Sequence, residues 1–263
     1  MNSNNLCEEN YFSQENNIKY TGSSQIKDFI KCEACALAKL KNEFIEEPSN
    51  AMLVSSYIDE AISGTLDIFK AKHPEILLKN GELKAPYKIA DSVLNQIEND
   101  EMFFKYLSGE HQVIMTGEIS NVPVKIKIDS YFKNKAIIDL KAMANLDLIW
   151  NEVTGQKENF IDYYNYILQG ALYQEIVRQN TGNKLPFIIA VATKQEYSRR
   201  ALLEIPQEKM NIELEKLKQY LPILQKIKEG KVESIACHHC DYCISKQKVE
   251  KIYYYDEFFK EEN

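Results

Sequence analysis

Two aspartates and a lysine stand in neighbouring apolar-alternating runs, in the stretch KIKIDSYFKNKAIIDLKAM at residues 125–143. Side chains alternate between the two faces of a strand, so Asp139 and Lys141 share one face. If the two runs pair as a hairpin about Lys133-Asn134, Asp129 lies roughly opposite Asp139. The spacing therefore predicts two carboxylates and one ammonium group at one place on a sheet.

Two carboxylates this close repel and raise each other's pKa unless a cation lies between them. Magnesium is held in proteins by one or two carboxylates together with phosphate oxygens. A lysine beside such a cluster can orient or deprotonate water, or stabilise the negative charge that develops on a phosphate. The alternative is a solvated strand face with alternating charges, which would carry no chemistry.

Helices are predicted before these strands. Residues 1–20 are polar and Asn-rich, which predicts a frayed arm that includes Cys7. A serine-capped helix is predicted in 21–40, with Ser23 or Ser24 as its cap. Its apolar face is formed by Ile26, Phe29, Ile30 and Leu37. Two more helices and a short helical piece are predicted at 48–69, 86–100 and 101–107.

The period of the apolar pattern then changes to two. It predicts three strands joined by tight turns, at 111–119, 122–132 and 135–143. The following elements are a long helix, an apolar central strand, another strand and a closing helix, at 158–180, 185–194, 200–206 and 207–229. This order predicts one α/β core with N-terminal helical decoration.

Composition limits the possible partners. The chain has 263 residues, 44% of them apolar, and a net charge of −7. A protein that coats nucleic acid nonspecifically is usually basic, so any DNA contact must use a local basic patch or metal ions. Arginine occurs only at Arg178, Arg199 and Arg200, which argues against sequence-specific readout. With no signal peptide and no long apolar run, we expect no membrane contact, a cytoplasmic location, and cysteines that are thiols or metal ligands.

The stretch IDSYFKNKAIIDLKA resembles the core of the PD-(D/E)xK nucleases, which carry one Asp on a strand and D-x-K at the end of the next. In SSYIDEAISG, Asp59 stands where RecB-like members place an extra metal contact on a helix. In QGALY, Gln169 and Tyr173 share a helix face and resemble the Q-x-x-x-Y motif of RecB-like nucleases. The ordered set resembles the phage-type exodeoxyribonuclease VIII-like (RecE-like) proteins, over roughly residues 20–248.

This resemblance implies a restriction-endonuclease-like core, with a central mixed sheet of about five strands flanked by helices. It implies that Asp129 and Asp139 hold Mg²⁺ or Mn²⁺, with help from Asp59 and the main-chain carbonyl of Leu140. Lys141 would position or activate the attacking water. Two further residues would support the site and contact the DNA backbone, namely Gln169 and Tyr173.

The implied function is a metal-dependent exodeoxyribonuclease that hydrolyses phosphodiester bonds at duplex ends in phage-type recombination or repair. The implied partners are DNA, a single-strand annealing protein and further copies of the chain. The acidic net charge fits a protein that meets DNA inside a narrow cleft or ring. Two alternatives stay open: an inactive relative that binds DNA ends or a recombination partner, and a small redox or zinc protein whose function is its cysteine tail.

The sequence CHHCDYC spaces three thiols as C-x-x-C-x-x-C, at Cys237, Cys240 and Cys243. Such a run can wrap one metal or cluster but needs a fourth ligand. The candidates are Cys32, Cys35, His238 and His239. RecB-like nucleases with an iron–sulfur staple have one cysteine before the core and three after it. Cys32 resembles that upstream cysteine, which implies a 4Fe–4S cluster that ties the first helix to the tail.

The gap before the last cysteine is shorter than in that staple. A structural Zn²⁺ held by four thiolates is therefore an alternative, and a set of unliganded thiols is another. The expected organisation is a frayed arm at 1–20, one nuclease domain at 21–248 and an extension at 249–263. Within the domain we expect a helical part, a catalytic core and a cysteine-rich tail, at 21–108, 109–230 and 231–248.

Overall fold

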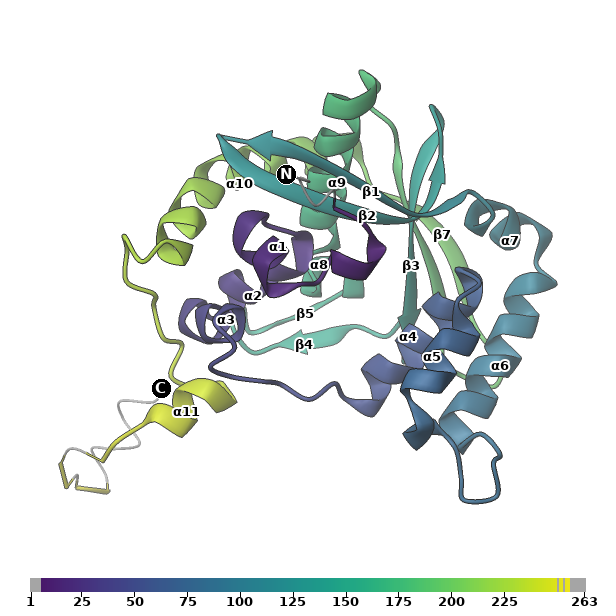
Figure 1. The fold of residues 1–263 in the computed structure, drawn as a ribbon, viewed down its shortest axis with the longest axis horizontal. Coiled ribbons are helices and arrows are strands. Elements are labelled where there is room, and N and C mark those ends of the chain that lie inside the picture. Colours follow the sequence, from purple (N-terminus) through teal and green to yellow (C-terminus); the bar gives the residue numbers. More distant parts are fainter. Residues whose placement is uncertain (1–5, 250, 253, 256–263) are drawn as a thin grey trace, which may run out of the picture.

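A five-stranded mixed sheet forms the centre of the molecule (Figure 1). The structure is a computed structural model that describes residues 6–249, 251–252 and 254–255. The strand order is β1-β2-β3-β6-β7, with β3 and β6 parallel and the other neighbours antiparallel. The strands are β1 (Glu110–Ile119), β2 (Val122–Phe132), β3 (Ala136–Met143), β6 (Phe187–Thr193) and β7 (Arg200–Glu204). The predicted α/β core with a mixed sheet of about five strands is confirmed.

Helices cover both faces of the sheet and enclose two hydrophobic clusters. One cluster lies under α9 (Tyr166–Thr181) and α10 (Gln207–Lys228). The other lies under α4 (Asn50–Ile62), α6 (Ala85–Glu98) and α7 (Glu101–Leu107). Every residue of β6 is buried, because the strand is covered from both sides, which explains its uninterrupted apolar sequence.

The remaining elements decorate this core. The N-terminal ones are η1 (Glu8–Asn10), α1 (Gln14–Lys19), α2 (Ser23–Lys31) and α3 (Glu33–Leu40). The others are α5 (Leu66–Lys72), η2 (Pro74–Ile76), β4 (Ile149–Asn151), β5 (Gln156–Glu158), α8 (Phe160–Tyr163) and α11 (Asp241–Lys246). None of the helices described is long and apolar enough to cross a membrane. Of the extension expected at 249–263, residues 250, 253 and 256–263 lie outside the described residues.

The single helix predicted in 21–40 is wrong, because the chain forms α2 and α3 with a break at Cys32. This residue is extended, and its Sγ accepts a hydrogen bond from the N–H of Cys35, which caps α3. The cap of α2 is Gly22 rather than Ser23 or Ser24. Ile30, predicted to be on the buried face, is 48% exposed.

Two other predicted helices are also divided. Residues 48–69 form α4 and α5, separated at Gly64, whose φ is 78°. Residues 158–180 form α8 and α9, separated at Asn165 in the left-handed conformation. A single left-handed residue ends a helix while the apolar residues around it keep a helical spacing. The apolar periodicity of the sequence therefore did not reveal these breaks. The short β4–β5 hairpin was not predicted either.

Residues 6–20 differ from the expected frayed arm, since they form η1 and α1 and pack on the core. The Nζ of Lys125 donates to the main-chain carbonyl of Tyr11 and, at 2.8 Å, to Oδ1 of Asn17. Lys228 donates to the carbonyl of Asn17 at 3.0 Å. The polar groups of this Asn-rich segment therefore serve as acceptors for two lysines of the core.

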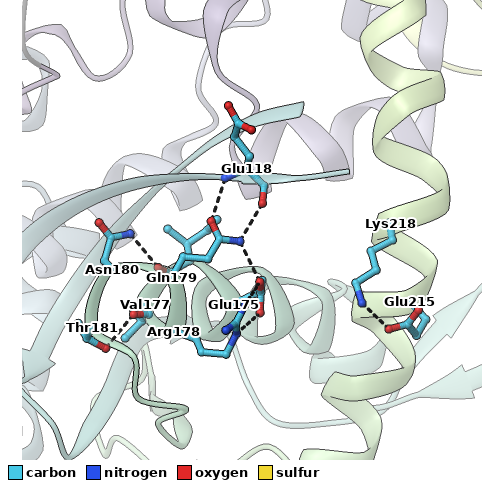
Figure 2. A network of polar contacts seen from close by, with 10 residues as sticks. Glu118, Glu175, Val177, Arg178, Gln179, Asn180, Thr181, Glu215 and Lys218 are labelled. Carbon is cyan, nitrogen blue, oxygen red and sulfur yellow. Dashed lines mark hydrogen bonds and ion pairs between the residues drawn. The ribbon is translucent and has the colours of Figure 1, made fainter. Parts of the chain in front are cut away.

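The end of α9 is fastened to the edge strand β1 (Figure 2). The Gln179 side chain accepts from the N–H of Glu118 at 3.0 Å and donates to its carbonyl at 2.8 Å. Asn180 donates to the carbonyl of Thr116 at 2.9 Å. These bonds occupy main-chain groups that an edge strand would otherwise expose, and they fix α9 across the sheet. Glu118 thus belongs to this edge network.

Candidate active site

The candidate site lies where β2 and β3 separate. The two strands pair over three residue pairs, the last being Ser130 and Ile138. Asp129 and Asp139 flank this last pair, on the side where the strands diverge. The N–H of Leu140 donates to Oδ2 of Asp129 at 2.9 Å, so the carboxylate of one strand fills the gap beside the other. The two aspartates are therefore neighbours, as the hairpin register predicts.

Asp139 is the centre of a polar chain. Its side chain is 2% exposed, with Oδ2 2.5 Å from the Nζ of Lys141. Its other oxygen, Oδ1, accepts from Nε2 of Gln169 at 2.6 Å. The Oε1 of Gln169 in turn accepts from the Nζ of Lys27 at 2.9 Å. Strand alternation thus brings Asp139 and Lys141 together, and α9 adds an amide that fixes the carboxylate.

Asp59 approaches from α4 and lines the same cavity as Asp129 and Asp139. Its Oδ1 is buried and has no hydrogen-bond partner among the residues described. Burial and the charge of Asp129 raise the pKa of Asp59 well above its usual range. The neighbouring Glu60 instead bonds to the hydroxyl of Thr65. Of the two adjacent acids, the structure therefore directs Asp59 toward the other carboxylates.

The electrostatics of the cluster favour a bound cation. Burial, and then the charge of Asp139, raise the pKa of Asp129 to about 7. Burial acts to lower the pKa of Lys141, but Asp139 and Asp129 outweigh it and raise that pKa. Lys141 is the ammonium group in direct contact with this cluster of three carboxylates.

An unpaired buried carboxylate oxygen and an all-oxygen donor set suit Mg²⁺ or Mn²⁺. A small pocket is lined by Asp59, Asp129 and Leu140 among others, and the expected role of the Leu140 carbonyl as a metal ligand stays a prediction.

A cavity of about 560 Å³ opens over these residues. Four lysines line it, from α2, β2 and β3: Lys27, Lys125, Lys127 and Lys141. Three aspartates share this lining with the lysines, so a nucleic-acid phosphate would be met there by the lysines together with a metal ion. These are the two means that the composition leaves for contact with nucleic acid.

Tyr173 also lines the cavity and holds two of its elements together. Its hydroxyl donates to the carbonyl of Lys127 at 3.0 Å, and its ring meets Phe187 edge-on at 5.9 Å. It therefore joins α9 to β2. The predicted contact of Tyr173 and Gln169 with a DNA backbone stays a prediction.

Among the residues of the cavity that sequence reasoning missed are Lys27, Tyr166 and Tyr11. Lys27 lies 4.4 Å from the centroid of the Tyr166 ring. Burial and the charge of Lys141 lower the pKa of Lys27 to about 7. Tyr166 lies three residues before Gln169 on one helix face, so the pattern could have revealed it. Lys27 gave no such signal, because it is 142 positions away from Gln169.

Four cysteines form a second cluster, at the junction of α2, α3 and α11. The ligand atoms of Cys32, Cys237, Cys240 and Cys243 all lie within 4.8 Å of one another. The Sγ of Cys243 is 3.6 Å from that of Cys32 and 3.9 Å from that of Cys237. The N–H of Cys240 donates to the Sγ of Cys237, as main-chain groups often do to metal-bound thiolates. This set could hold a metal, with Cys32 in the fourth position rather than Cys35 or a histidine.

A mixed sheet that separates between its two aspartate-bearing strands, next to a D-x-K lysine, defines a PD-(D/E)xK nuclease fold. The family model described as "PDDEXK-like domain of unknown function (DUF3799)" matches residues 22–246, and the chain belongs to this family.

The chain is also similar to a solved structure from Eubacterium rectale, described as a "Putative exonuclease". The two share 42% sequence identity and a TM-score of 0.91, over 97% of this chain and 98% of the other. No curated protein matches the sequence.

Proposed function

We propose that this protein is a metal-dependent DNA nuclease that hydrolyses phosphodiester bonds at the ends of duplex DNA. The convergence of Asp59, Asp129 and Asp139 around Lys141 in one cavity carries the proposal. The family supports a nuclease, and the description of the similar solved structure supports the choice of an exonuclease. Action in phage-type recombination, a single-strand annealing partner and a homo-oligomer stay predictions.

Asp59, Asp129, Asp139 and the carbonyl of Leu140 would hold Mg²⁺ or Mn²⁺. A bound divalent cation lowers the pKa of water and offsets the charge of a phosphate. Lys141, held by Asp139, is placed to hydrogen-bond the attacking water or a phosphate oxygen. Gln169 keeps Asp139 in one orientation. Lys27, whose Nζ lies 4.4 Å from the centroid of the Tyr166 ring that Lys141 also faces, would add a second positive charge for a phosphate backbone when it is protonated.

For the cysteine cluster we propose one structural Zn²⁺. Around a single tetrahedral zinc, thiolates at about 2.3 Å from the metal lie about 3.8 Å from one another. Two of the six separations are 3.6 and 3.9 Å, close to this spacing, and all six lie within 4.8 Å. In a 4Fe–4S cluster each thiolate binds a different iron, which sets the sulfurs farther apart. Four thiolates leave no open position on zinc, so the cluster supports the fold rather than the reaction. This geometry also speaks against a protein whose function is the cysteine tail.

Two functions remain, an active exonuclease and an inactive relative that binds DNA ends. They are distinguished by a cleavage assay on end-labelled linear duplex and on closed circular duplex, each with Mg²⁺ and with a chelator. We expect the linear DNA to be degraded with Mg²⁺ only, and the circle to stay intact. Asp139→Asn should lose about 10²–10³-fold or more in rate, because it removes one charge and keeps the shape. Asp67→Asn, an exposed acid on α5, is the matched control.

Cleavage of the circular DNA would show that the protein is an endonuclease rather than an exonuclease. Full activity of Asp139→Asn would exclude the site, and a wild-type protein that binds DNA without cutting it would be the inactive end-binding module.

A further inference from the structure

The connection between β3 and α9, residues 144–165, presents exposed aromatic side chains beside the proposed catalytic cavity. Trp150, the only tryptophan of the chain, is 55% exposed on β4. Tyr164 is 41% exposed at the end of α8. Aromatic residues usually bury a large apolar area, so two exposed rings in one short connection need an explanation.

Tyr164 is directly continuous with the cavity wall. Its ring lies 5.9 Å from the ring of Tyr166, with the two planes inclined by only 34°. Tyr166 lines the cavity, and its ring centroid is 5.1 Å from the Nζ of Lys141. One ring contact therefore separates the exposed tyrosine from the wall beside the D-x-K lysine. Bases in a stacked strand repeat about every 3.4 Å, so a strand of a few nucleotides could extend from Lys141 to Tyr164.

The Tyr164 ring is held in place. Tyr163 meets it edge-on at 4.9 Å, on the side of α8. Asn165, the next residue, has φ 52° and ψ 45°. Asparagine tolerates the left-handed conformation better than most residues, and Asn42, Asn121 and Asn134 adopt it in this chain as well. Here the left-handed turn ends α8 and starts α9, which sets Tyr164 outside the cavity and Tyr166 inside. A ring ordered in advance loses little entropy when it binds a ligand.

Trp150 is fixed by the short hairpin that carries it. Its neighbour Ile149 packs against the main hydrophobic cluster, so alternation turns Trp150 toward solvent. Asn151 donates to Glu158 across the hairpin at 3.0 Å. The strand β4 contacts α8, and in Figure 1 the hairpin runs from the end of β3 toward that helix. The tryptophan is therefore presented on a hairpin that follows the D-x-K strand in the chain and contacts α8, the helix that ends next to Tyr164.

We propose that Tyr164 and Trp150 stack the bases of an unpaired nucleic-acid strand whose phosphates follow the lysine-lined cavity. The inference rests on the proposed nuclease function and specifies that the strand entering the cavity from a duplex end is unpaired there. Lysines beside flat exposed rings match a polyanion with aromatic bases, and they do not match an apolar partner. Inside a duplex each base face is covered by its neighbours, and only the terminal pair has a free face. Rings that stack on bases away from that end therefore need bases that are unpaired. Stacking is also tolerant of sequence, in accord with the scarcity of arginine.

The test uses the full chain with Asp139→Asn, in the presence of a chelator, so that binding is measured without cleavage. A short oligothymidylate should quench the fluorescence of Trp150, and its affinity is followed by anisotropy of a labelled strand. We expect Tyr164→Ala and Trp150→Ala each to weaken binding by about five- to a hundredfold. Phe104→Ala is the matched control, since Phe104 is also 41% exposed, like Tyr164, but lies on α7, outside the connection between β3 and α9.

A second probe has the same length and phosphates but abasic sites in place of bases. The parent should bind it more weakly than oligothymidylate, and the two aromatic variants should bind it as the parent does, because only phosphate contacts remain. If Tyr164→Ala and Trp150→Ala bind oligothymidylate within twofold of the parent, the stacking proposal is overturned while the nuclease proposal stands. A parent that binds neither probe, nor duplex DNA, contradicts both proposals.

Discussion

The side-chain amide of Gln169 links Asp139 to Lys27. Its Nε2 donates to the Asp139 carboxylate at 2.6 Å and its Oε1 accepts from the Lys27 ammonium at 2.9 Å. The amide therefore has an anion at its donor end and a cation at its acceptor end, which allows only one orientation. Residues that orient a metal-binding carboxylate in this way commonly affect metal affinity as strongly as the ligands themselves.

Gln169→Ala should lower the affinity for Mg²⁺ or the turnover by about ten- to a hundredfold, because Asp139 loses its orienting partner. Gln169→Glu should be worse, since it places a second carboxylate against Asp139. The measurement is the cleavage rate as a function of Mg²⁺, with DNA affinity followed separately. Gln174→Ala is the control: Gln174 lies on the same helix and is 4% exposed, against 5% for Gln169, but it contacts Leu185 and Gln207. Equal Mg²⁺ dependence in both variants would reduce Gln169 to a packing residue.

Lys141→Gln separates catalysis from binding. We expect turnover to fall by about 10²–10³-fold, because a cation that stabilises charge in the transition state is lost. Binding of DNA and of Mg²⁺ should persist, since the carboxylates remain. Single-turnover cleavage and anisotropy measure the two effects, with the exposed Lys135→Gln as control. A variant that both binds and cuts like wild type would show that Lys141 only solvates a strand face.

Strand alternation explains why the centre of the site could be predicted. It places Asp139 and Lys141 on one face whatever the tertiary structure, and the short turn at Lys133-Asn134 brings Asp129 beside them. The apolar pattern likewise predicted all five strands of the main sheet. Resemblance to known nucleases added Asp59, which no local pattern indicates.

The features that sequence did not predict depend on single residues or on distant contacts. Cys32 and Asn165 each interrupt a continuous helical pattern, because one backbone angle is enough to break a helix. Lys27 joins the site only through the packing of α2 against α9. The polar segment 6–20 was expected to fray, since its ordering depends on acceptors offered to Lys125 and Lys228.

The buried Lys125 predicts a pH dependence of stability. Burial lowers its pKa to about 8, from an ordinary value of 10.5. Between these values the unfolded chain binds more protons than the folded chain, so the free energy of unfolding rises with pH. The slope is at most about 1.4 kcal/mol per pH unit, and it disappears below the folded pKa, where both states are charged.

Lys125→Met should reduce the slope by the contribution of one group, since burial also lowers the pKa of Lys228 to about 8 and that of Lys27 to about 7. It should also loosen residues 6–20. Urea unfolding near pH 8 and near pH 10 measures the slope, with the exposed Lys135→Met as control. If the free energy of unfolding rises equally with pH in the parent and in Lys125→Met, the pKa of Lys125 is not lowered in the folded protein.

The cysteine cluster makes the remaining prediction. Cys32 and Cys243 are 211 positions apart, so a metal that joins them closes a loop of most of the chain. In the cross-link model such a closure stabilises by roughly 2–5 kcal/mol, because it restricts the unfolded state. Anaerobically purified protein should hold one zinc per chain and neither iron nor acid-labile sulfide. Cys240→Ser should lose the zinc and melt at a lower temperature. Its activity should fall only indirectly, because α2, which carries Lys27, becomes less firmly held. Cys7→Ser, a change at an exposed cysteine, should behave as wild type. Iron with sulfide would instead establish the 4Fe–4S cluster, and a metal-free wild type that melts like Cys240→Ser would leave the four thiols without a ligand-binding role.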